Sequence, residues 1–456
     1  MTSTFGSCSP YPYLSAGVPG SFAYRTVKDR MPVILTKVID FLCRNKHEIL
    51  ESSTAEAGSI EDLKLIIGKL SQLRSEMQTN KTLRPLEISS SHLRDGAKWN
   101  NELIEAKDSS SPQWFSSPWL LVECYMYRAI YCIFENSIHL KRLDPFSHMK
   151  EELIISQKYV LSQLVAYTND LSQTITSASH LQANFMKLLE ISLWANRNDL
   201  SLSGGNAETK PGSFLDDVEQ LSSHILVNNA NELWLYVEQV QKDFRNKELG
   251  IIMDNSGLEM VADLCLAVYC ISHQLFDRVI FYVKKIPWFV SDTTFDDLQW
   301  ALHYMEKDVP EMQCFASKCL GYLDSQQFQV VEEGYFTLPL PYHVMNKEDP
   351  DLYNKLSQSQ LLIFKGDLNY RKLGADIDWP STTTFEKFLQ GFKPAPLVAL
   401  RTIKAEIICD IPSTKVCPSC KTKLLTMIVT AHSFLHSYHP RASDHFFSTV
   451  TCNVKF

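Results

Sequence analysis

Residues 251–260 read IIMDNSGLEM, an apolar run that stops at an acid and an amide, turns at Gly257 and becomes apolar again. Such a run, followed by a polar turn and a helical pattern, predicts a strand, a loop and a helix. Two interpretations of Asp254 and Asn255 fit this unit. They cap the helix, as short polar side chains at turns commonly do, or they bind a metal ion at the end of the strand.

Four short apolar runs predict strands at residues 250–253, 278–283, 360–364 and 397–400. Each of the first two is followed by apolar residues at helical spacing. Strand, loop and helix in this order indicate an α/β fold with a mostly parallel, Rossmann-like sheet. Upstream, helical spacing persists from residue 21 to about residue 215.

The change of period predicts how the chain is divided. We expect a flexible leader at 1–20, a helical N-terminal domain at 21–215, an α/β domain that binds metal and phosphate at 216–410 and a C-terminal tail at 411–456.

Composition excludes several classes of protein. Of 456 residues, 45% are apolar and 21% are charged, as in an ordinary globular protein. A net charge of -8 argues against a broad nucleic-acid-binding face, and no apolar run approaches the roughly 18 residues of a membrane span. Twelve scattered cysteines suit a reducing compartment, so we expect a cytoplasmic protein that is also present in the nucleus.

Polar side chains follow the predicted strands, at the sheet edge where α/β proteins bind ligands. Asp254 and Asn255 follow the first strand, and Asp292 lies shortly after the second. Their oxygen atoms suit a hard divalent cation such as Mg²⁺ or Mn²⁺. For an isolated D-N-x-G turn the helix cap is the commoner outcome, but the second acid favours the metal.

Four cations lie near the last two strands, at Lys365, Arg371, Arg401 and Lys404. A metal with two or three such cations forms a phosphate clamp, in which catalysis is largely electrostatic. The alternative is surface solvation, which is the norm for charged side chains. A phosphoaspartate mechanism would call for a second Asp two positions after Asp254, where the chain has Ser256. We therefore favour a metal-activated water or direct metal assistance.

Glu123 and Asn196 carry weaker signals. Glu123 lies on a largely apolar helix, which favours a buried ion pair over catalysis. Asn196 and Asp199 either reach the site or end a helix, and the helix end is favoured.

The tail contains a CPSC motif, Cys417 to Cys420, followed by His432 and His436. Its spacing is one residue short of the zinc-finger pattern, and an unpaired segment is favoured over a zinc site.

Seven motifs occur in order along the chain: SFAYRTVKDRMP, SPWLLVECYMYR, LSLSGG, DNSGLE, PWFVSDTT, FKGDLNYRKL and RTIKAEI. Together they resemble the metal-dependent damage-control phosphatase family, in its RTxK subgroup. The resemblance covers residues 21–408, and after Cys409 the chain departs from the family's usual ending. The motif positions precede this departure, so the site residues are complete, while closure of the domain behind Lys404, and with it stability and activity, depends on the tail.

The resemblance implies a helical N-terminal domain packed on an α/β/α domain that binds Mn²⁺ or Ni²⁺. It implies hydrolysis of small sugar phosphates such as fructose 1-phosphate and fructose 6-phosphate, with Asp254 and Asp292 as catalytic residues. The implied metal ligands are Asp254, Asn255 and Asp292. The implied substrate-binding residues are Asp254, Asn255, Asp367, Leu368, Asn369, Tyr370, Arg371 and Lys404.

The same resemblance implies a second activity. This is carboxyl methylation of protein glutamates by S-adenosylmethionine, with the DNA sliding clamp as a target and with Glu259 and Asp292 at the cofactor. The chain has no glycine-rich cofactor loop, and a cluster of acids suits a metal better than a sulfonium donor. The phosphatase activity is therefore ranked first.

Overall fold

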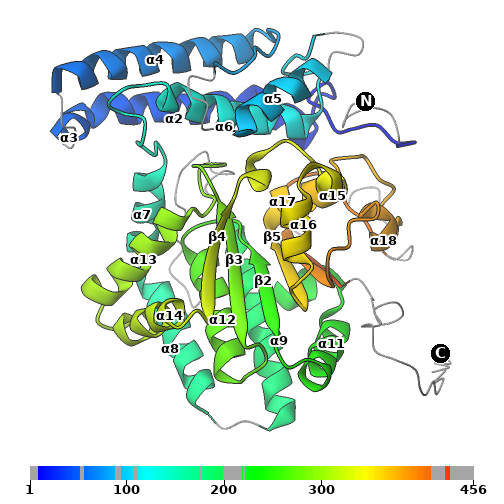
Figure 1. Cartoon of the computed structure of the whole chain (residues 1–456). Helices are drawn as coiled ribbons and strands as arrows, with labels where there is room; N and C mark the ends of the chain where they lie inside the picture. Colours follow the sequence, from blue (N-terminus) through cyan, green and yellow to red (C-terminus); the bar gives the residue numbers. More distant parts are fainter. Residues whose placement is uncertain are drawn as a thin grey trace.

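The fold is built around a seven-stranded sheet with the strand order β1-β7-β6-β5-β2-β3-β4 (Figure 1). A computed structural model describes residues 9–51, 56–87, 94–105, 111–174, 177–198, 218, 221–411 and 427–431. The calls on Asp199 and on the CPSC motif with its two histidines lie outside these residues.

The mostly parallel sheet is confirmed. β4, β3, β2, β5 and β6 are joined by parallel pairing in that spatial order. The four predicted strands are β2 (Glu248–Ile252), β3 (Arg278–Lys284), β5 (Leu361–Lys365) and β6 (Leu397–Thr402).

Three strands were not predicted, namely β1 (Ile225–Asn228), β4 (Phe328–Glu333) and β7 (Met427–Ala431). β4 is only half-buried, so it lacks the continuous apolar run that marks a central parallel strand. β7 lies within the predicted tail and pairs antiparallel to β6 and parallel to β1.

One face of the sheet is covered by α12 (Leu258–Ser272), which is buried from Leu258 to Ile271. A helix that is buried on all sides is typical of a position between two layers, and α8 and α9 pack on the side of α12 away from the sheet. These two helices lie before the predicted boundary at residue 215, yet their side chains share one apolar cluster with the strands. The helices of this part are α7 (Ser147–Ser156), α8 (Lys158–Gln173), α9 (Ala178–Trp194), α11 (Ala230–Asp243), α13 (Phe295–Asp308) and α14 (Gln313–Asp324).

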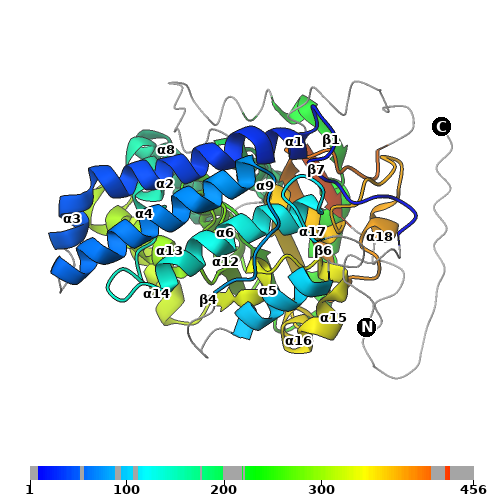
Figure 2. The same cartoon turned by 90° about the horizontal axis from the view of Figure 1, so that it is seen from above.

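A layer of helices lies across one end of the sheet, at the top of Figure 1 and facing the viewer in Figure 2. We call it the helical layer. The helical pattern predicted from residue 21 is present but divided into α1, a π-helical turn η1, α2 and α3. The layer consists of α1 (Phe22–Arg25), η1 (Thr26–Arg30), α2 (Met31–Arg44), α3 (Lys46–Glu51), α4 (Glu56–Gln78), α5 (Arg94–Glu105) and α6 (Trp119–Glu135).

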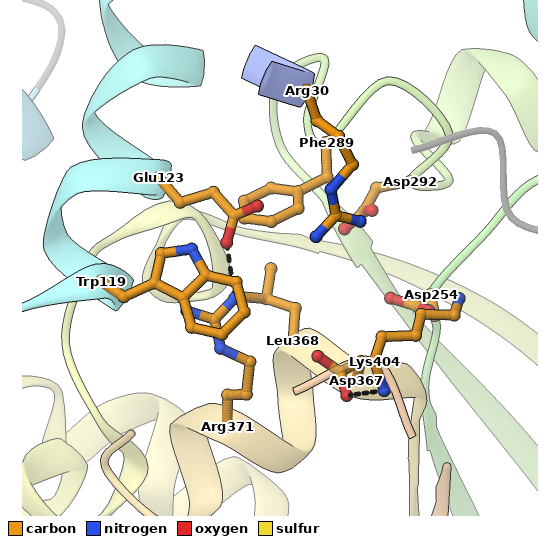
Figure 3. Close-up of a pocket in the computed structure, with 10 residues that line it drawn as sticks. All are labelled: Arg30, Trp119, Glu123, Asp254, Phe289, Asp292, Asp367, Leu368, Arg371 and Lys404. Atoms are coloured by element: carbon orange, nitrogen blue, oxygen red, sulfur yellow. Dashed lines mark hydrogen bonds and ion pairs between the residues drawn. The ribbon is translucent and has the colours of Figure 1, made fainter. Parts of the chain in front are cut away.

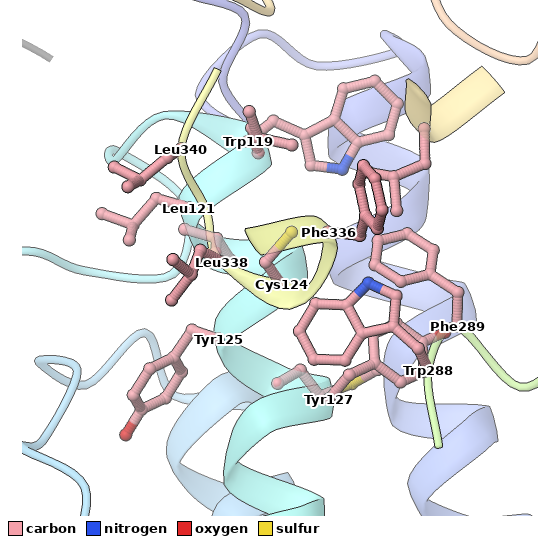
Figure 4. Packing of buried hydrophobic residues seen from close by; sticks show 14 of the residues in the cluster. Trp119, Leu121, Cys124, Tyr125, Tyr127, Trp288, Phe289, Phe336, Leu338 and Leu340 are labelled. Atoms are coloured by element: carbon pink, nitrogen blue, oxygen red, sulfur yellow. The ribbon is translucent and has the colours of Figure 1, made fainter. Parts of the chain in front are cut away.

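Aromatic side chains join the helical layer to the loop after β3 (Figure 4). Tyr127 of α6 stacks on Phe289 with ring centroids 4.5 Å apart, and the centroid of the Trp288 ring lies 6.0 Å from that of Tyr127. Buried aromatic pairs of this kind contribute about 0.5–1.5 kcal/mol beyond their buried area. The layer is thereby packed against the end of the sheet where the candidate site lies.

The remaining elements are short and connect the strands. Within the segment expected to be a flexible leader, Leu14 donates its backbone N–H to Asp376 (2.8 Å) and accepts one from Trp119 (2.8 Å). The short elements are η2 (Ala195–Asn198), η3 (Ser222–His224), η4 (Gly334–Thr337), η5 (Tyr342–Val344), α15 (Met345–Glu348), α16 (Pro350–Leu356), α17 (Gly366–Leu373) and α18 (Phe385–Phe388).

Among the described residues, no helix combines the length and apolarity needed to cross a membrane. The eight cysteines in the described ranges are all without disulfide bonds.

Candidate active site

The ends of β2 and β3 bring Asp254, Asn255 and Asp292 together. Asn255 and Asp292 form an isolated antiparallel bridge, and the backbone N–H of Thr293 donates to the carbonyl of Asp254 (2.8 Å). The three side chains are only 2–5% exposed. Two loops that sequence reasoning treated separately therefore form one rigid unit.

The N-cap of α12 is neither Asp254 nor Asn255. α12 begins at Leu258 with Gly257 as its N-cap, a residue that has no side chain to form a capping hydrogen bond. Gly257 has a φ of 78°, a left-handed conformation that glycine adopts at little cost. The turn therefore depends on Gly257, and the polar pair before it is directed elsewhere.

Asp254 and Asp292 open onto a pocket (Figure 3). The walls come from the loops after β2, β3 and β6, from α17 after β5 and from the helical layer. The lining residues are Arg30, Trp119, Glu123, Asp254, Phe289, Asp292, Asp367, Leu368, Arg371 and Lys404.

Two amides hold the Asp254 carboxylate in place. The side chains of Asn196 and Asn255 both donate to its Oδ2, at 2.8 and 2.9 Å. The same two amides donate to Glu259 Oε2, at 2.7 and 2.8 Å, and Lys365 lies 3.1 Å from Glu259 Oε1. Asn196 thus reaches the site, which sequence reasoning considered but ranked below a helix end.

Asp292 and Asn255 are also fixed by their neighbours. Lys284 at the end of β3 lies 3.0 Å from Asp292 Oδ2 and donates to the carbonyl of Met253 (2.7 Å). The hydroxyl of Ser291 donates to Asn255 Oδ1 (2.6 Å). Each candidate ligand is thus oriented by a second side chain, as is usual around metal sites.

Gly366, the first residue of α17, lies directly against Asp254. A Cβ on Gly366 would lie 1.9 Å from Asp254 Oδ2, and its φ of 82° again favours glycine. The carboxylate occupies the space that any other residue would fill. The glycine of FKGDLNYRKL is therefore explained by packing against a carboxylate 112 residues earlier in the chain.

The donor set fits a divalent cation. Asp254, Asn255 and Asp292 offer hard oxygen atoms from adjacent loops, and the pocket is lined by four carboxylates against three cations. Outside the lining, Lys284 and Arg401 lie against two of these carboxylates, Asp292 and Asp367. Within the described residues there is no group of three His, Cys, Asp or Glu side chains suited to a metal, so the set consists of two carboxylates and one amide.

The predicted phosphate clamp is only partly present, because Lys365 and Arg401 do not line the pocket. Lys365 is fully buried and pairs with Asp263 (2.9 Å) as well as Glu259. Arg401 is also fully buried and donates to Asp367 Oδ1 (2.7 Å). Both charges are matched by carboxylates, as buried cations require.

Arg371 and Lys404 do line the pocket. Arg371 donates through two nitrogens to Asp376 (2.9 and 2.8 Å) and pairs with Glu123 at 2.5 Å, which confirms the ion pair expected for Glu123. Its guanidinium lies 3.6 Å from the ring centroid of Trp119. Burial opposes the charge, but Asp376 and Glu123 outweigh it and raise the pKa of Arg371.

Lys404 and Asp367 face the same space (Figure 3). The Lys404 backbone N–H donates to Asp367 Oδ1 (3.1 Å), and its Nζ donates to the carbonyl of Asn196 (3.2 Å). The RTxK motif thus brings Lys404 to the pocket, while Arg401 pairs with Asp367 in the first turn of α17.

Three residues expected to bind substrate do not line the pocket, namely Asn255, Asn369 and Tyr370. The Asn369 amide donates to the carbonyl of Lys365 (2.8 Å) and its oxygen accepts from the hydroxyl of Tyr342. The hydroxyl of Tyr370 lies 3.1 Å from Cys409 Sγ. Glu259 is likewise absent from the lining. Leu368, by contrast, is part of the wall.

Sequence reasoning missed three lining residues, Arg30, Trp119 and Phe289. All three lie inside the motifs that carry the family resemblance. Their spacing relative to the predicted strands does not identify them as pocket residues, because two of them come from the helical layer.

Comparisons with known proteins show the family of this chain. The family model described as the damage-control phosphatase ARMT1-like domain matches residues 26–417. The chain is 40% identical over 407 residues to the human protein named damage-control phosphatase ARMT1, with 86% of this chain and 91% of that protein covered. The mouse protein of that name is 39% identical over 402 residues (87% and 91% covered), and the zebrafish protein is 36% identical over 405 (86% and 89%). The chain therefore belongs to the ARMT1-like family of damage-control phosphatases.

Proposed function

We propose that this protein is a metal-dependent phosphomonoesterase that hydrolyses small sugar phosphates such as fructose 1-phosphate and fructose 6-phosphate, with Mn²⁺ or Ni²⁺ as its metal. The observation that carries the proposal is that Asp254 and Asp292 line one pocket with Lys404 and Arg371, while Asn255 lies beside both carboxylates, bridged to Asp292 and bonded to Asp254. Family membership supports the phosphatase chemistry.

In this proposal Asp254, Asn255 and Asp292 hold the metal through their side-chain oxygens. When bound, the metal supplies a Lewis acid that polarises the phosphoryl group and favours a reactive water. Asn196 and Lys284 keep the two carboxylates in position through the contacts described above. Preorganised ligands of this kind spare the site a reorganisation cost during the reaction.

Lys404 binds the phosphoryl oxygens and stabilises the negative charge that gathers on them. Arg371 is held by two carboxylates and stacked on Trp119, so its side chain is fixed in position and presents positive charge to the pocket. Asp367 and Glu123 offer carboxylate oxygens that accept hydrogen bonds from sugar hydroxyls. The mixture of cations and acceptors suits a ligand that carries both a phosphate and hydroxyl groups.

Phosphate release from fructose 1-phosphate and fructose 6-phosphate, with and without Mn²⁺ or Ni²⁺, tests the proposal. The wild-type protein should release phosphate only with metal, and Asp254→Ala should lose at least about 100-fold of that activity. Asp308→Ala, at the end of α13 and outside the pocket lining, is a matched loss of one carboxylate and should remain active. Full activity of Asp254→Ala would overturn the proposal.

The second predicted activity, glutamate methylation of the DNA sliding clamp with S-adenosylmethionine, has less support. Glu259, expected at the cofactor, is 1% exposed and bonded to Asn196, Asn255 and Lys365. A cofactor would have to displace these contacts to reach it. Incubation with labelled cofactor and the clamp, against a boiled control, measures this activity directly, and base-labile label on the clamp would support it.

A further inference from the structure

Arg30 is a pocket cation from the helical layer with no role in the metal site. We propose that Arg30 binds the phosphate group of the substrate and determines specificity for phosphorylated ligands. The inference rests on the proposed function and extends it to a residue about 220 positions before the metal ligands in the chain.

The local structure directs Arg30 toward the pocket. Pro32 has no N–H, so the α-helical hydrogen-bond ladder cannot continue unbroken across residues 26–32. Instead the N–H of Met31 donates to the carbonyl of Thr26, five residues back, and closes the π-helical turn η1. π-helical turns are rare and frequent at functional sites. The Thr26 hydroxyl accepts a hydrogen bond from the Arg30 guanidinium and orients it.

The turn is tied to the loop that carries Lys404. The backbone N–H of Phe22, at the start of α1, donates to Glu406 Oε1 at 2.6 Å. Glu406 lies two residues after Lys404, so the helical layer and the RTxK segment are held in a fixed relation. In Figure 3 the Arg30 guanidinium points into the space above Asp254 and Lys404.

The charge balance distinguishes Arg30 from the other arginines near the site. Arg371 pairs with Glu123 and Asp376, and Arg401 pairs with Asp367. Within the described residues no ion pair of 4 Å or less involves Arg30, although it lines the pocket. Its guanidinium therefore keeps donors for a ligand.

A phosphate monoester fits this arrangement. A guanidinium presents parallel N–H donors that match two phosphate oxygens, and it binds phosphate more directionally than an ammonium group does. Lys404 and Asp254 lie below the Arg30 guanidinium in Figure 3, so a phosphate between them is held from two sides. A neutral sugar gains nothing from Arg30, and this difference is the source of the proposed specificity.

The test compares Arg30→Ala and Arg30→Lys with the control Lys28→Ala. Lys28 is exposed in the same turn and does not line the pocket. Binding of inorganic phosphate to the Mn²⁺-loaded full chain is measured by titration calorimetry, and KM and kcat are measured with fructose 1-phosphate. Arg30→Ala should weaken phosphate binding and raise KM by about tenfold or more, Arg30→Lys should retain part of the affinity, and Lys28→Ala should match the wild type.

The outcomes separate this inference from the proposed function. If the wild type hydrolyses the sugar phosphate and both Arg30 variants keep its KM and phosphate affinity, the inference is overturned and the proposed function stands. If the wild type neither binds phosphate nor hydrolyses the ester, the proposed function fails and the inference fails with it. If Arg30→Ala is unfolded by thermal melting, the Arg30→Lys result decides: an unchanged KM overturns the inference and a raised KM supports it.

Discussion

Substitution of Gly366 by alanine tests whether the position of Asp254 controls activity. The added Cβ would lie 1.9 Å from Asp254 Oδ2, whereas an ordinary van der Waals contact is at least 3.4 Å, so the carboxylate must move by about 1.5 Å. Misplacing a reacting or coordinating group by about 1 Å costs on the order of 100-fold in rate. Gly366→Ala should therefore lose at least about 100-fold of the metal-dependent phosphatase activity.

Backbone strain is a second consequence of the same change and must be separated from the first. An L-residue at a φ of 82° costs about 1–2 kcal/mol of stability. Gly391 has a φ of 88° and nothing within 4 Å of the Cβ position, so Gly391→Ala carries the strain without any contact to the site. The two variants should melt below the wild type, but only Gly366→Ala should be inactive.

The assay is phosphate release at saturating metal, together with Mn²⁺ titration of each variant. Gly366→Ala should bind Mn²⁺ more weakly than Gly391→Ala, because one ligand is displaced. Equal activity and equal metal affinity in the two variants would refute the reasoning that places Asp254 in the metal site.

Three other perturbations have expected outcomes. Asn196→Ala removes a donor to Asp254 and should weaken Mn²⁺ binding by about 10–100-fold, the usual cost of losing a residue that orients a ligand; unchanged affinity in a metal titration would contradict this. Arg371→Lys loses the two-nitrogen contact with Asp376 and should lower the free energy of unfolding by about 2–3 kcal/mol, and a denaturant melt identical to the wild type would argue against it. Burial lowers the pKa of His343 below 6.5, so the unfolded chain binds more protons and stability falls as the pH drops below 6.5. Melting temperatures between pH 7.5 and 5.5 should fall less in His343→Gln than in the wild type, and equal slopes would exclude this role.

The position of the helical layer explains why the site needs the N-terminal part of the chain. Trp119 and Glu123 of α6 contact Arg371 of α17 across the pocket, and the aromatic contacts of Tyr127 fix the layer to the loop after β3. A cut between the helical region and the α/β region would expose this apolar surface and remove one wall of the pocket. The division expected at residue 215 stays a prediction. α8 and α9 lie before that residue, yet their side chains pack with the sheet in one apolar cluster.

The sequence by itself determined the parallel sheet, its central strands and the meeting of Asp254, Asn255 and Asp292. The strands follow from local periodicity, which can be read from each segment of sequence alone. The meeting of the three side chains follows from the rule that parallel strands end at one edge of the sheet. The half-buried strand β4 was not predicted, because a strand at the edge of the sheet has no continuous apolar run.

Only the tertiary structure decided which polar residues face the pocket. Lys365, Arg371, Arg401 and Lys404 look alike in sequence, but burial next to Asp263 or Asp367 removes two of them from the site. The physical reason is that a buried charge requires an opposite charge beside it, and the tertiary fold supplies that partner, often from a distant part of the chain. Arg30 reaches the pocket for the same reason, through a π-helical turn and a helical layer whose placement depends on contacts made more than 100 residues away.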